Sequence, residues 1–215
     1  MGIKVLGIPM STCTARVLTS LLEKEVDYEL VPIDMGKGEH KSPDYLAKHP
    51  FGQIPVLQDD DLTLFESRAI TSYVSYKYKD QGTDLLRIGN VKETALVGVW
   101  IEVESQQYNP AILPIVYQLV IVPMYGQSPD LAIVEAHVEK FNKVLDVYEA
   151  RLSHHKYLAG DFFSLADLNH FPFTYYLMKT QYASLINDRP HVKAWWESVS
   201  SRPAFKKVAE NMTLA

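Results

Sequence analysis

Cysteine is nearly absent from this sequence, in which Cys13 is the single thiol among 215 residues. One cysteine cannot form an intrachain disulfide, so the chain does not belong with small secreted proteins that disulfides hold together. A lone thiol fits a reducing compartment, and we expect a cytoplasmic protein. The composition, with 47% hydrophobic and 22% charged residues, is typical of a globular protein with a sizeable core.

An excess of positive charge is also missing. The formal net charge is −5, and lysine and arginine form no cluster that could follow a phosphate backbone. We therefore expect no nucleic-acid partner.

No hydrophobic run is long enough for a membrane-spanning helix, which needs about 20 residues. The most apolar window, Ala111–Tyr125, is interrupted by Pro114, Gln118 and Pro123, and we expect it to form a buried helix. The first ten residues contain no basic stretch followed by an apolar core, so we expect neither export nor a membrane anchor.

The first 80 residues combine strand and helix patterns. Short apolar runs predict four strands, at Lys4–Ile8, Tyr28–Ile33, Ile54–Gln58 and Leu62–Phe65. Apolar residues three and four positions apart predict two helices, at Ser11–Leu22 and Arg68–Tyr78. The acidic triplet Asp59–Asp61 lies between two predicted strands, where a turn explains it better than a metal site. We predict a small α/β domain over residues 1–80.

Strand patterns disappear after residues 81–90, which we interpret as a linker. From residue 91 to 215 apolar residues recur at helical spacing, as at Val138, Phe141 and Leu145. Ser164 and Asp167 are spaced as a capping box, in which each side chain bonds the other residue's backbone N–H group, so a helix is predicted to start at Ser164. The second domain is predicted to be all helix.

Several short motifs occur in a fixed order along the chain. They are STCTARV at Ser11–Val17, EHKSP at Glu39–Pro43, PFGQIP at Pro50–Pro55, FESRAI at Phe65–Ile70, and LAGD at Leu158–Asp161 with SLAD at Ser164–Asp167. Together they resemble the phi class of soluble glutathione S-transferases, best known from plants. The resemblance extends from about Ile3 to Met212.

This resemblance implies a thioredoxin-like N-terminal domain followed by an all-helical C-terminal domain that carries much of the electrophile site. It also implies a homodimer that conjugates the thiolate of reduced glutathione to hydrophobic electrophiles, and that can also reduce hydroperoxides. Glutathione is then a co-substrate, with no other cofactor and no metal. A non-catalytic carrier of hydrophobic small molecules is the alternative from the same family.

The resemblance also assigns residues to the two ends of glutathione. Glu66 and Ser67 match the residues that hold the γ-glutamyl end, at the start of the helix predicted from Arg68. Free N–H groups and the helix dipole attract a carboxylate there, while the Glu66 carboxylate can take the ammonium. His40 and Lys41 match residues near the glycyl carboxylate.

The middle of the tripeptide is assigned to Gln53 and Ile54. By resemblance, Gln53 hydrogen-bonds glutathione and Ile54 pairs its backbone with the cysteinyl unit, which a cis Ile54–Pro55 bond makes possible. Taken one at a time these residues have simpler explanations, since Ser67 could be only a helix N-cap and Glu66 an ordinary surface acid. Their joint order favours the binding role.

Ser11 is the candidate catalytic residue, because the matching serine donates a hydrogen bond to the glutathione sulfur. A free thiol of pKa about 8.5 is only about 3% thiolate at pH 7. Lowering that pKa by about two units needs about 2.7 kcal/mol. One hydrogen bond to a charged group supplies about 1.5–3 kcal/mol, and a helix N-terminus adds about 0.3–1. A simple N-cap role for Ser11 is the alternative.

Cys13 suggests a different chemistry. Some relatives carry cysteine at the activating position and act as thiol transferases through a mixed disulfide, but here the cysteine falls two residues after Ser11. Near a helix start its pKa could still be depressed, so Cys13-dependent thiol transfer, a regulatory thiol and an inert small residue all remain open.

The electrophile pocket is expected between the two domains. Its candidate wall residues are apolar or aromatic, and core packing explains each of them equally well; they are Met10, Met35, Ile115, Leu119 and Tyr176.

Phe51 is predicted to anchor the dimer. It lies in a loop beside Gly52 and Gln53 with no evident apolar neighbour, and related transferases insert an aromatic residue at this point between helices of the partner subunit. An anchor of this kind contributes about 2 kcal/mol or more.

Overall fold

The computed structural model describes residues 2–213, which form two compact units. The first contains the chain up to Asp84 together with Lys207–Thr213, and the second contains Leu85–Lys206. The division at Asp84 falls inside the stretch 81–90 that the sequence marks as a linker. Residues 207–213 group with the first unit, although the sequence places them in the second domain. Residues 1 and 214–215 of the predicted domains lie outside the described part of the chain.

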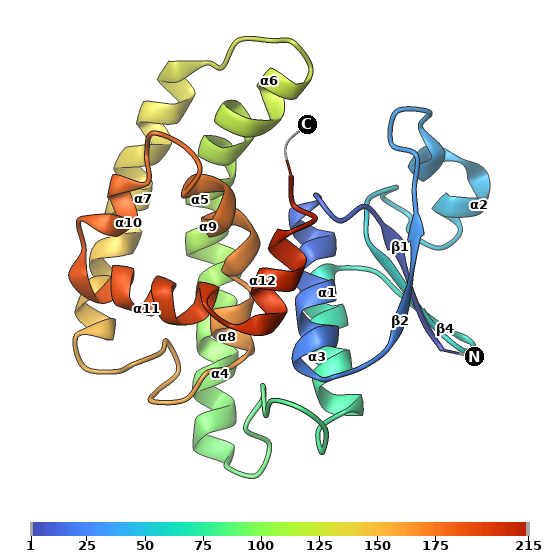
Figure 1. Ribbon diagram of the computed structural model, residues 1–215, viewed down its shortest axis with the longest axis horizontal. Coiled ribbons are helices and arrows are strands. Elements are labelled where there is room, and N and C mark those ends of the chain that lie inside the picture. Colours follow the sequence, from blue (N-terminus) through green and yellow to red (C-terminus); the bar gives the residue numbers. More distant parts are fainter. Residues whose placement is uncertain (1, 214–215) are drawn as a thin grey trace. The chain divides into compact units, whose positions relative to one another are not determined.

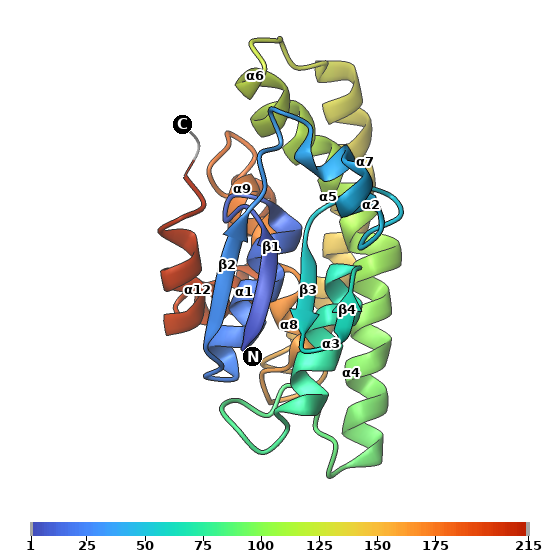
Figure 2. The same ribbon diagram turned by 90° about the vertical axis from the view of Figure 1, so that its right-hand side faces the viewer.

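The first unit contains a four-stranded sheet, whose strands stand side by side in Figure 2. The strands are β1 (Ile3–Gly7), β2 (Tyr28–Pro32), β3 (Val56–Asp59) and β4 (Leu62–Leu64), in the order β2-β1-β3-β4. β1 pairs parallel with β2 and antiparallel with β3, and β3 and β4 form an antiparallel hairpin. Val5 pairs with Leu30 on one side and Leu57 on the other, and both Val5 and Leu57 are fully buried.

Two longer helices cover this sheet. They are α1 (Thr12–Glu23) and α3 (Ser67–Lys77), which pack against each other and carry buried apolar residues such as Leu21 and Val74. A 3-10 turn at Glu39–Lys41 and the short helix α2 (Pro43–Leu46) connect β2 to β3 (Figure 1). A small mixed sheet with helices packed on it confirms the predicted thioredoxin-like unit.

The second unit is built from helices, and no strand occurs among its described residues. Its elements are α4 (Val91–Val103), a π turn (Glu104–Tyr108), α5 (Asn109–Val116), a second π turn (Tyr117–Ile121), α6 (Val122–Met124), α7 (Leu131–Leu152), α8 (Leu165–Leu168), α9 (Phe171–Leu177), α10 (Ser184–Asn187) and α11 (Pro190–Ser200); α12 (Pro203–Ala209) continues into the first unit. Bulky aromatic rings such as Phe141, Tyr148 and Trp195 fill the core. Over residues 2–213, no helix has the length and apolarity needed to cross a membrane.

The predicted capping box is confirmed at α8. The Asp167 carboxylate accepts hydrogen bonds from the backbone N–H of Ser164 at 3.0 Å and from its hydroxyl at 3.1 Å. It also accepts from the Leu158 N–H at 3.0 Å and the Trp195 indole at 2.9 Å. Burial raises the pKa of Asp167 to about 6, although these four donors act in the opposite direction. The carboxylate is therefore the centre of a buried network within the second unit.

Candidate active site

The first helix begins with the candidate catalytic serine as its N-cap. Ser11 has an extended backbone, and its Oγ accepts a hydrogen bond from the Thr14 N–H at 3.4 Å. This confirms the N-cap role that the sequence allowed. Accepting one bond uses a lone pair only, so the hydroxyl proton of Ser11 can still be donated to a ligand. The cap role and the catalytic role are therefore compatible.

The third helix begins at Ser67, one residue earlier than the sequence predicts. Its N-cap, Glu66, has a φ of 69° and makes no side-chain cap bond. The first intrahelical bond runs from the Ile70 N–H to the Glu66 carbonyl at 2.9 Å. The earlier N–H groups of such a helix have no partner within it, and helix starts of this kind can bind anions.

Arg16 connects the first and third helices. Its guanidinium is fully buried, and Nη1 donates to Ser67 Oγ at 2.8 Å. A guanidinium only donates, so Ser67 Oγ accepts here and its own proton remains for another acceptor. Arg16 lies in the STCTARV motif without an assigned role. The signal for it was a cation placed between apolar residues of an amphipathic helix.

The loop before the third strand is held by Lys41. The Lys41 ammonium donates to the carbonyls of Phe51 at 3.0 Å and Gly52 at 2.8 Å. Gly52 has a φ of +57°, and an added Cβ there would lie 2.7 Å from the His40 carbonyl oxygen. Only glycine therefore fits between this loop and the 3-10 turn.

Tyr45 holds the next residues of the same loop. Its hydroxyl donates to the Gln53 carbonyl at 2.8 Å, and its ring lies in a buried cluster with Leu6 and Val56, against which Ile54 packs. Burial raises the pKa of Tyr45 to about 12, so the hydroxyl keeps its proton at neutral pH. The Ile54–Pro55 bond is cis, as the resemblance implied.

Three rings gather beside this loop. Phe51 is 66% exposed, and its ring meets His49 at a centroid distance of 6.2 Å and Phe65 at 6.4 Å. His49 and Phe65 lie closer, at 4.8 Å. The exposed anchor candidate thus rests on two rings of its own unit.

Known proteins match this chain over its whole length. The glutathione S-transferase N-terminal domain family matches residues 1–76, and the C-terminal domain family matches residues 112–203. The chain belongs to the glutathione S-transferase family. Glutathione S-transferase F13 of Arabidopsis thaliana is 56% identical over 215 residues, covering 100% of this chain and 98% of that protein. The phi-class resemblance is confirmed.

Solved glutathione S-transferases have the same fold. Glutathione transferase F7 from Populus trichocarpa aligns with a TM-score of 0.97 and 66% identity, covering 98% of this chain and 99% of that one. Glutathione S-transferase I from mais, in complex with an atrazine glutathione conjugate, aligns with a TM-score of 0.92 and 52% identity over 99% of this chain and 98% of that one. The predicted two-part fold is thereby confirmed.

Two of the predicted glutathione residues of this glutathione S-transferase, Ser67 and Lys41, make hydrogen bonds within the first unit. Arg16 joins the first helix to Ser67, and Lys41 joins the 3-10 turn to the loop of Gln53. His40 is half-buried, and its Nδ1 has no hydrogen-bond partner among the described residues. Glu66 directly follows Phe65 in the sequence. No contact tests their ligand roles, which stay predictions.

The electrophile-wall candidates are divided between the two units. Met10 is half-buried, and Met35 packs against the cluster around Tyr45. Leu119 is half-buried in the second π turn. Ile115 and Tyr176 are 0% and 1% exposed, so these two side chains leave almost no surface for a ligand. For them the structure favours core packing, the alternative that the sequence left open.

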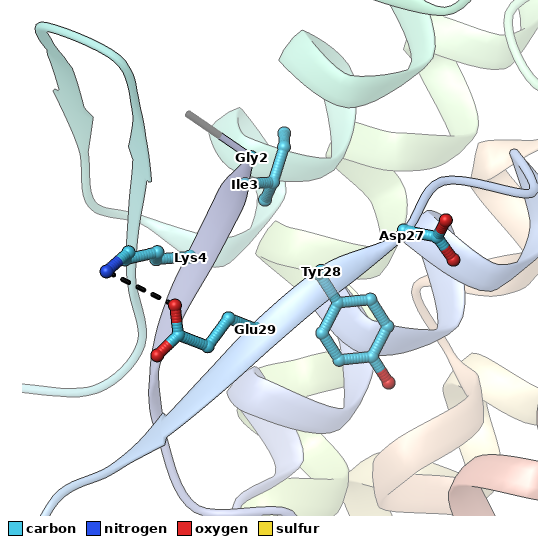
Figure 3. Close-up of a pocket in the computed structure, with 6 residues that line it drawn as sticks. All are labelled: Gly2, Ile3, Lys4, Asp27, Tyr28 and Glu29. Carbon is cyan, nitrogen blue, oxygen red and sulfur yellow. Dashed lines mark ion pairs between the residues drawn. The ribbon is translucent and has the colours of Figure 1, made fainter.

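The remaining candidate features are the single cysteine, a metal site and a surface pocket. Cys13 is half-buried, with its Sγ 3.7 Å from Arg16 Nη1. Among the described residues, no group of three histidine, cysteine or acidic side chains could hold a metal ion. Figure 3 shows a surface pocket at the start of β1 and β2, where Lys4 pairs with Glu29 at 3.2 Å beside Tyr28. None of the predicted site residues lines it.

Proposed function

We propose that this chain is a glutathione transferase that adds the thiolate of reduced glutathione to hydrophobic electrophiles. The observation that carries the proposal is the start of the first helix, where Ser11 Oγ accepts a hydrogen bond from the Thr14 N–H. That bond leaves the hydroxyl proton available for donation to the sulfur. A solved relative, glutathione S-transferase I from mais, is a complex with an atrazine glutathione conjugate, which supports conjugation as the reaction.

Glutathione is held at its γ-glutamyl end by the start of the third helix. The carboxylate accepts from the helix N–H groups and from the Ser67 hydroxyl, which Arg16 orients by donating to its oxygen. The Glu66 carboxylate takes the ammonium. The zwitterionic end of the ligand thus meets charges of opposite sign at both of its groups.

The rest of the tripeptide lies along the loop before the third strand. Ile54 pairs its backbone with the cysteinyl unit, Gln53 hydrogen-bonds the peptide, and His40 and Lys41 approach the glycyl carboxylate. Lys41 already donates to Phe51 and Gly52, so it would bind the carboxylate while keeping the loop closed. An ammonium has three donors, which is enough for all of these partners.

The chemistry is nucleophilic attack by the bound sulfur. The thiol proton leaves to solvent, and the Ser11 hydroxyl donates to the remaining thiolate, which favours the charged form. The thiolate forms a carbon–sulfur bond to the electrophile, and a leaving group such as halide departs with its electron pair. Ser11 is not itself the nucleophile. Holding both reactants together supplies the proximity term of the rate enhancement.

The protein acts as a cytoplasmic homodimer in this proposal. The exposed ring of Phe51 would enter an apolar pocket of a second copy, because a 66% exposed phenylalanine otherwise leaves apolar surface in water. The single thiol suits a reducing compartment that also keeps glutathione reduced.

The decisive experiment is a turnover panel with reduced glutathione. Aryl halide, isothiocyanate, hydroperoxide and mixed-disulfide substrates are compared for the wild-type protein, for Ser11→Ala and for Cys13→Ser. We expect turnover of the electrophiles that Ser11→Ala lowers strongly and Cys13→Ser leaves near wild type. Activity confined to the mixed disulfide, and lost in Cys13→Ser, would replace the proposal with thiol transfer. Binding of apolar ligands without any turnover would replace it with carriage.

A further inference from the structure

His49 is a buried histidine that the proposed chemistry does not use. It follows α2 and is 2% exposed, with its ring 4.8 Å from Phe65 at a 33° tilt and 6.2 Å from Phe51 in an edge contact. Phe65 directly precedes Glu66, and Phe51 precedes Gly52 and Gln53. The imidazole therefore lies between the two chain segments that carry the predicted glutathione residues.

The backbone of His49 belongs to the same arrangement. Its N–H donates to the Tyr45 carbonyl at 2.9 Å, and its carbonyl accepts from the Gly52 N–H at 2.8 Å. Tyr45 in turn donates from its hydroxyl to the Gln53 carbonyl. Movement of His49 would therefore disturb the turn that sets the direction of Gln53.

The imidazole is placed to stay neutral. Its Nδ1 is buried, and among the described residues it has no hydrogen-bond partner. A neutral ring with its proton on Nε2 leaves only a lone pair at Nδ1. Protonation puts a positive charge on a ring that is 2% exposed, and this desolvation outweighs the hydrogen bond that the charged ring makes to the backbone of His49.

Charged and titratable neighbours act on His49 from several elements. Burial holds the pKa of His49 below its ordinary value of 6.5; the Glu66 carboxylate opposes this and the Lys41 ammonium reinforces it. His40 lies in the 3-10 turn that touches Gly52, and the Tyr45 hydroxyl stays protonated. Because the folded pKa is lowered, the closed arrangement is favoured above the ordinary value and is lost as pH falls below it.

We propose that His49 is a positioning residue whose neutral ring holds the Phe51–Gln53 loop against Phe65, so that its protonation releases the loop and weakens glutathione binding. This inference rests on the proposed glutathione site. The released loop exposes the imidazolium to water, and only the closed loop presents Gln53 and Ile54 to the ligand. The apparent affinity then falls with the fraction of closed protein.

The test measures affinity for S-methylglutathione by calorimetry between about pH 7.5 and 5. This probe has no thiol, so the titration of sulfur drops out. We expect wild-type affinity to fall by about three- to tenfold over this range.

Two variants of His49 make the test specific. His49→Phe keeps a ring against Phe65 but cannot titrate, and we expect near wild-type affinity at about pH 7.5 with no fall at acid pH. His49→Gln removes both the ring and the titration, so its affinity is lower and equally independent of pH. His137→Gln is the matched control, since His137 lies in α7 and also has a buried Nδ1 without a partner among the described residues. It should keep the wild-type fall.

The outcomes separate this inference from the proposed function. A wild-type protein without the fall, or a fall that persists in both His49 variants, would overturn the role of His49 while leaving the glutathione site in place. Failure of wild-type protein to bind S-methylglutathione at any pH would overturn the glutathione site itself. A fall that disappears in His137→Gln would assign the titration to the second unit and contradict the inference.

Discussion

Two helix N-termini in this protein differ in how their N-cap residues are bonded. α8 begins after Ser164, and the chain supplies its own carboxylate, Asp167, which accepts from the Ser164 backbone and hydroxyl. α3 begins after Glu66, whose side chain makes no cap bond. The start of α8 thus has a side-chain cap from the protein itself, whereas the start of α3 is the predicted site for the γ-glutamyl carboxylate.

The two helix starts also differ in their contribution to stability. Asp167 is completely buried and accepts from four donors, so its network stabilises the second unit. Glu66 holds a φ of 69°, which for a residue other than glycine costs about 1–3 kcal/mol. The comparison indicates a buried hydrogen-bond network at α8 and backbone strain at the N-cap of α3.

Removing the buried Asp167 carboxylate should give the largest effect. Asp167→Ala leaves four donors, including the Leu158 N–H and the Trp195 indole, without their acceptor. We expect the free energy of unfolding to fall by about 3–5 kcal/mol. Urea denaturation measures it. Asp161→Ala, at an exposed acid that accepts from the Lys156 N–H at 3.0 Å and lies 3.9 Å from His155 Nδ1, should cost about 1 kcal/mol or less.

The same carboxylate predicts a pH dependence. The folded pKa of Asp167 is raised to about 6 from an ordinary value of 3.8, so the folded state binds the proton more tightly than the unfolded state. Its contribution to stability is therefore fully present below the ordinary value and is lost as pH rises through about 6. Asp167→Asn should lack this part of the stability profile. An Asn variant with the wild-type slope between these values would contradict the raised pKa.

Ser11→Ala tests the first helix, whose N-cap residue is also the predicted hydrogen-bond donor to the glutathione sulfur. The lost hydrogen bond to the thiolate corresponds to about 1.5–3 kcal/mol, so we expect kcat to fall about 10- to 150-fold. Affinity for glutathione should change little. Ultraviolet titration of the bound thiolate should show its pKa rising toward the free value. An unchanged thiolate pKa would remove Ser11 from the mechanism.

Phe51→Ala probes a surface that neither helix start involves. Loss of an aromatic anchor costs about 2 kcal/mol or more, which shifts a dimer toward monomer in sedimentation velocity at micromolar concentration. Glutathione affinity should fall as well, because Phe51 rests on His49 and Phe65. Tyr125→Ala removes a ring that is 75% exposed in the second unit and serves as the control. A Phe51 variant as dimeric as wild type on dilution would refute the anchor.

Ser67→Ala should have the smallest effect. It removes the hydroxyl beside the predicted γ-glutamyl carboxylate and leaves Arg16 Nη1 without that acceptor. We expect KM for glutathione to rise about five- to tenfold, with kcat and the thiolate pKa less affected. Glu66→Ala should act in the same direction through the ammonium. Unchanged glutathione binding in both variants would show that the helix start does not hold this end of the tripeptide.

Local patterns were sufficient for most elements of the fold. The predicted strand at Tyr28–Ile33 is observed as Tyr28–Pro32, and the predicted helix at Arg68–Tyr78 as Ser67–Lys77. These elements are set by alternation and helical spacing within a few residues. Both π turns lie within long helical patterns, which do not specify a change from one helical hydrogen-bond register to another.

The candidate site could be predicted from the sequence less completely than the fold. Motifs placed Ser11, Glu66 and Ser67 at helix starts, and the structure has them there. Ile115 and Tyr176 could be wall or core on their apolar character alone, and only their burial separates the two. The apolar character of a side chain does not by itself indicate which neighbours it will contact.

The sequence by itself determined the helix caps at Ser11 and Ser164, because a cap needs only a side chain and N–H groups two or three residues away. Tertiary structure decided that Arg16 reaches Ser67, 51 residues along the chain, and that His49 lies against Phe65 with Nδ1 unpaired among the described residues. Such contacts depend on how helices and loops pack around the sheet. Their hydrogen bonds and burial follow from distances in space, which local spacing does not encode.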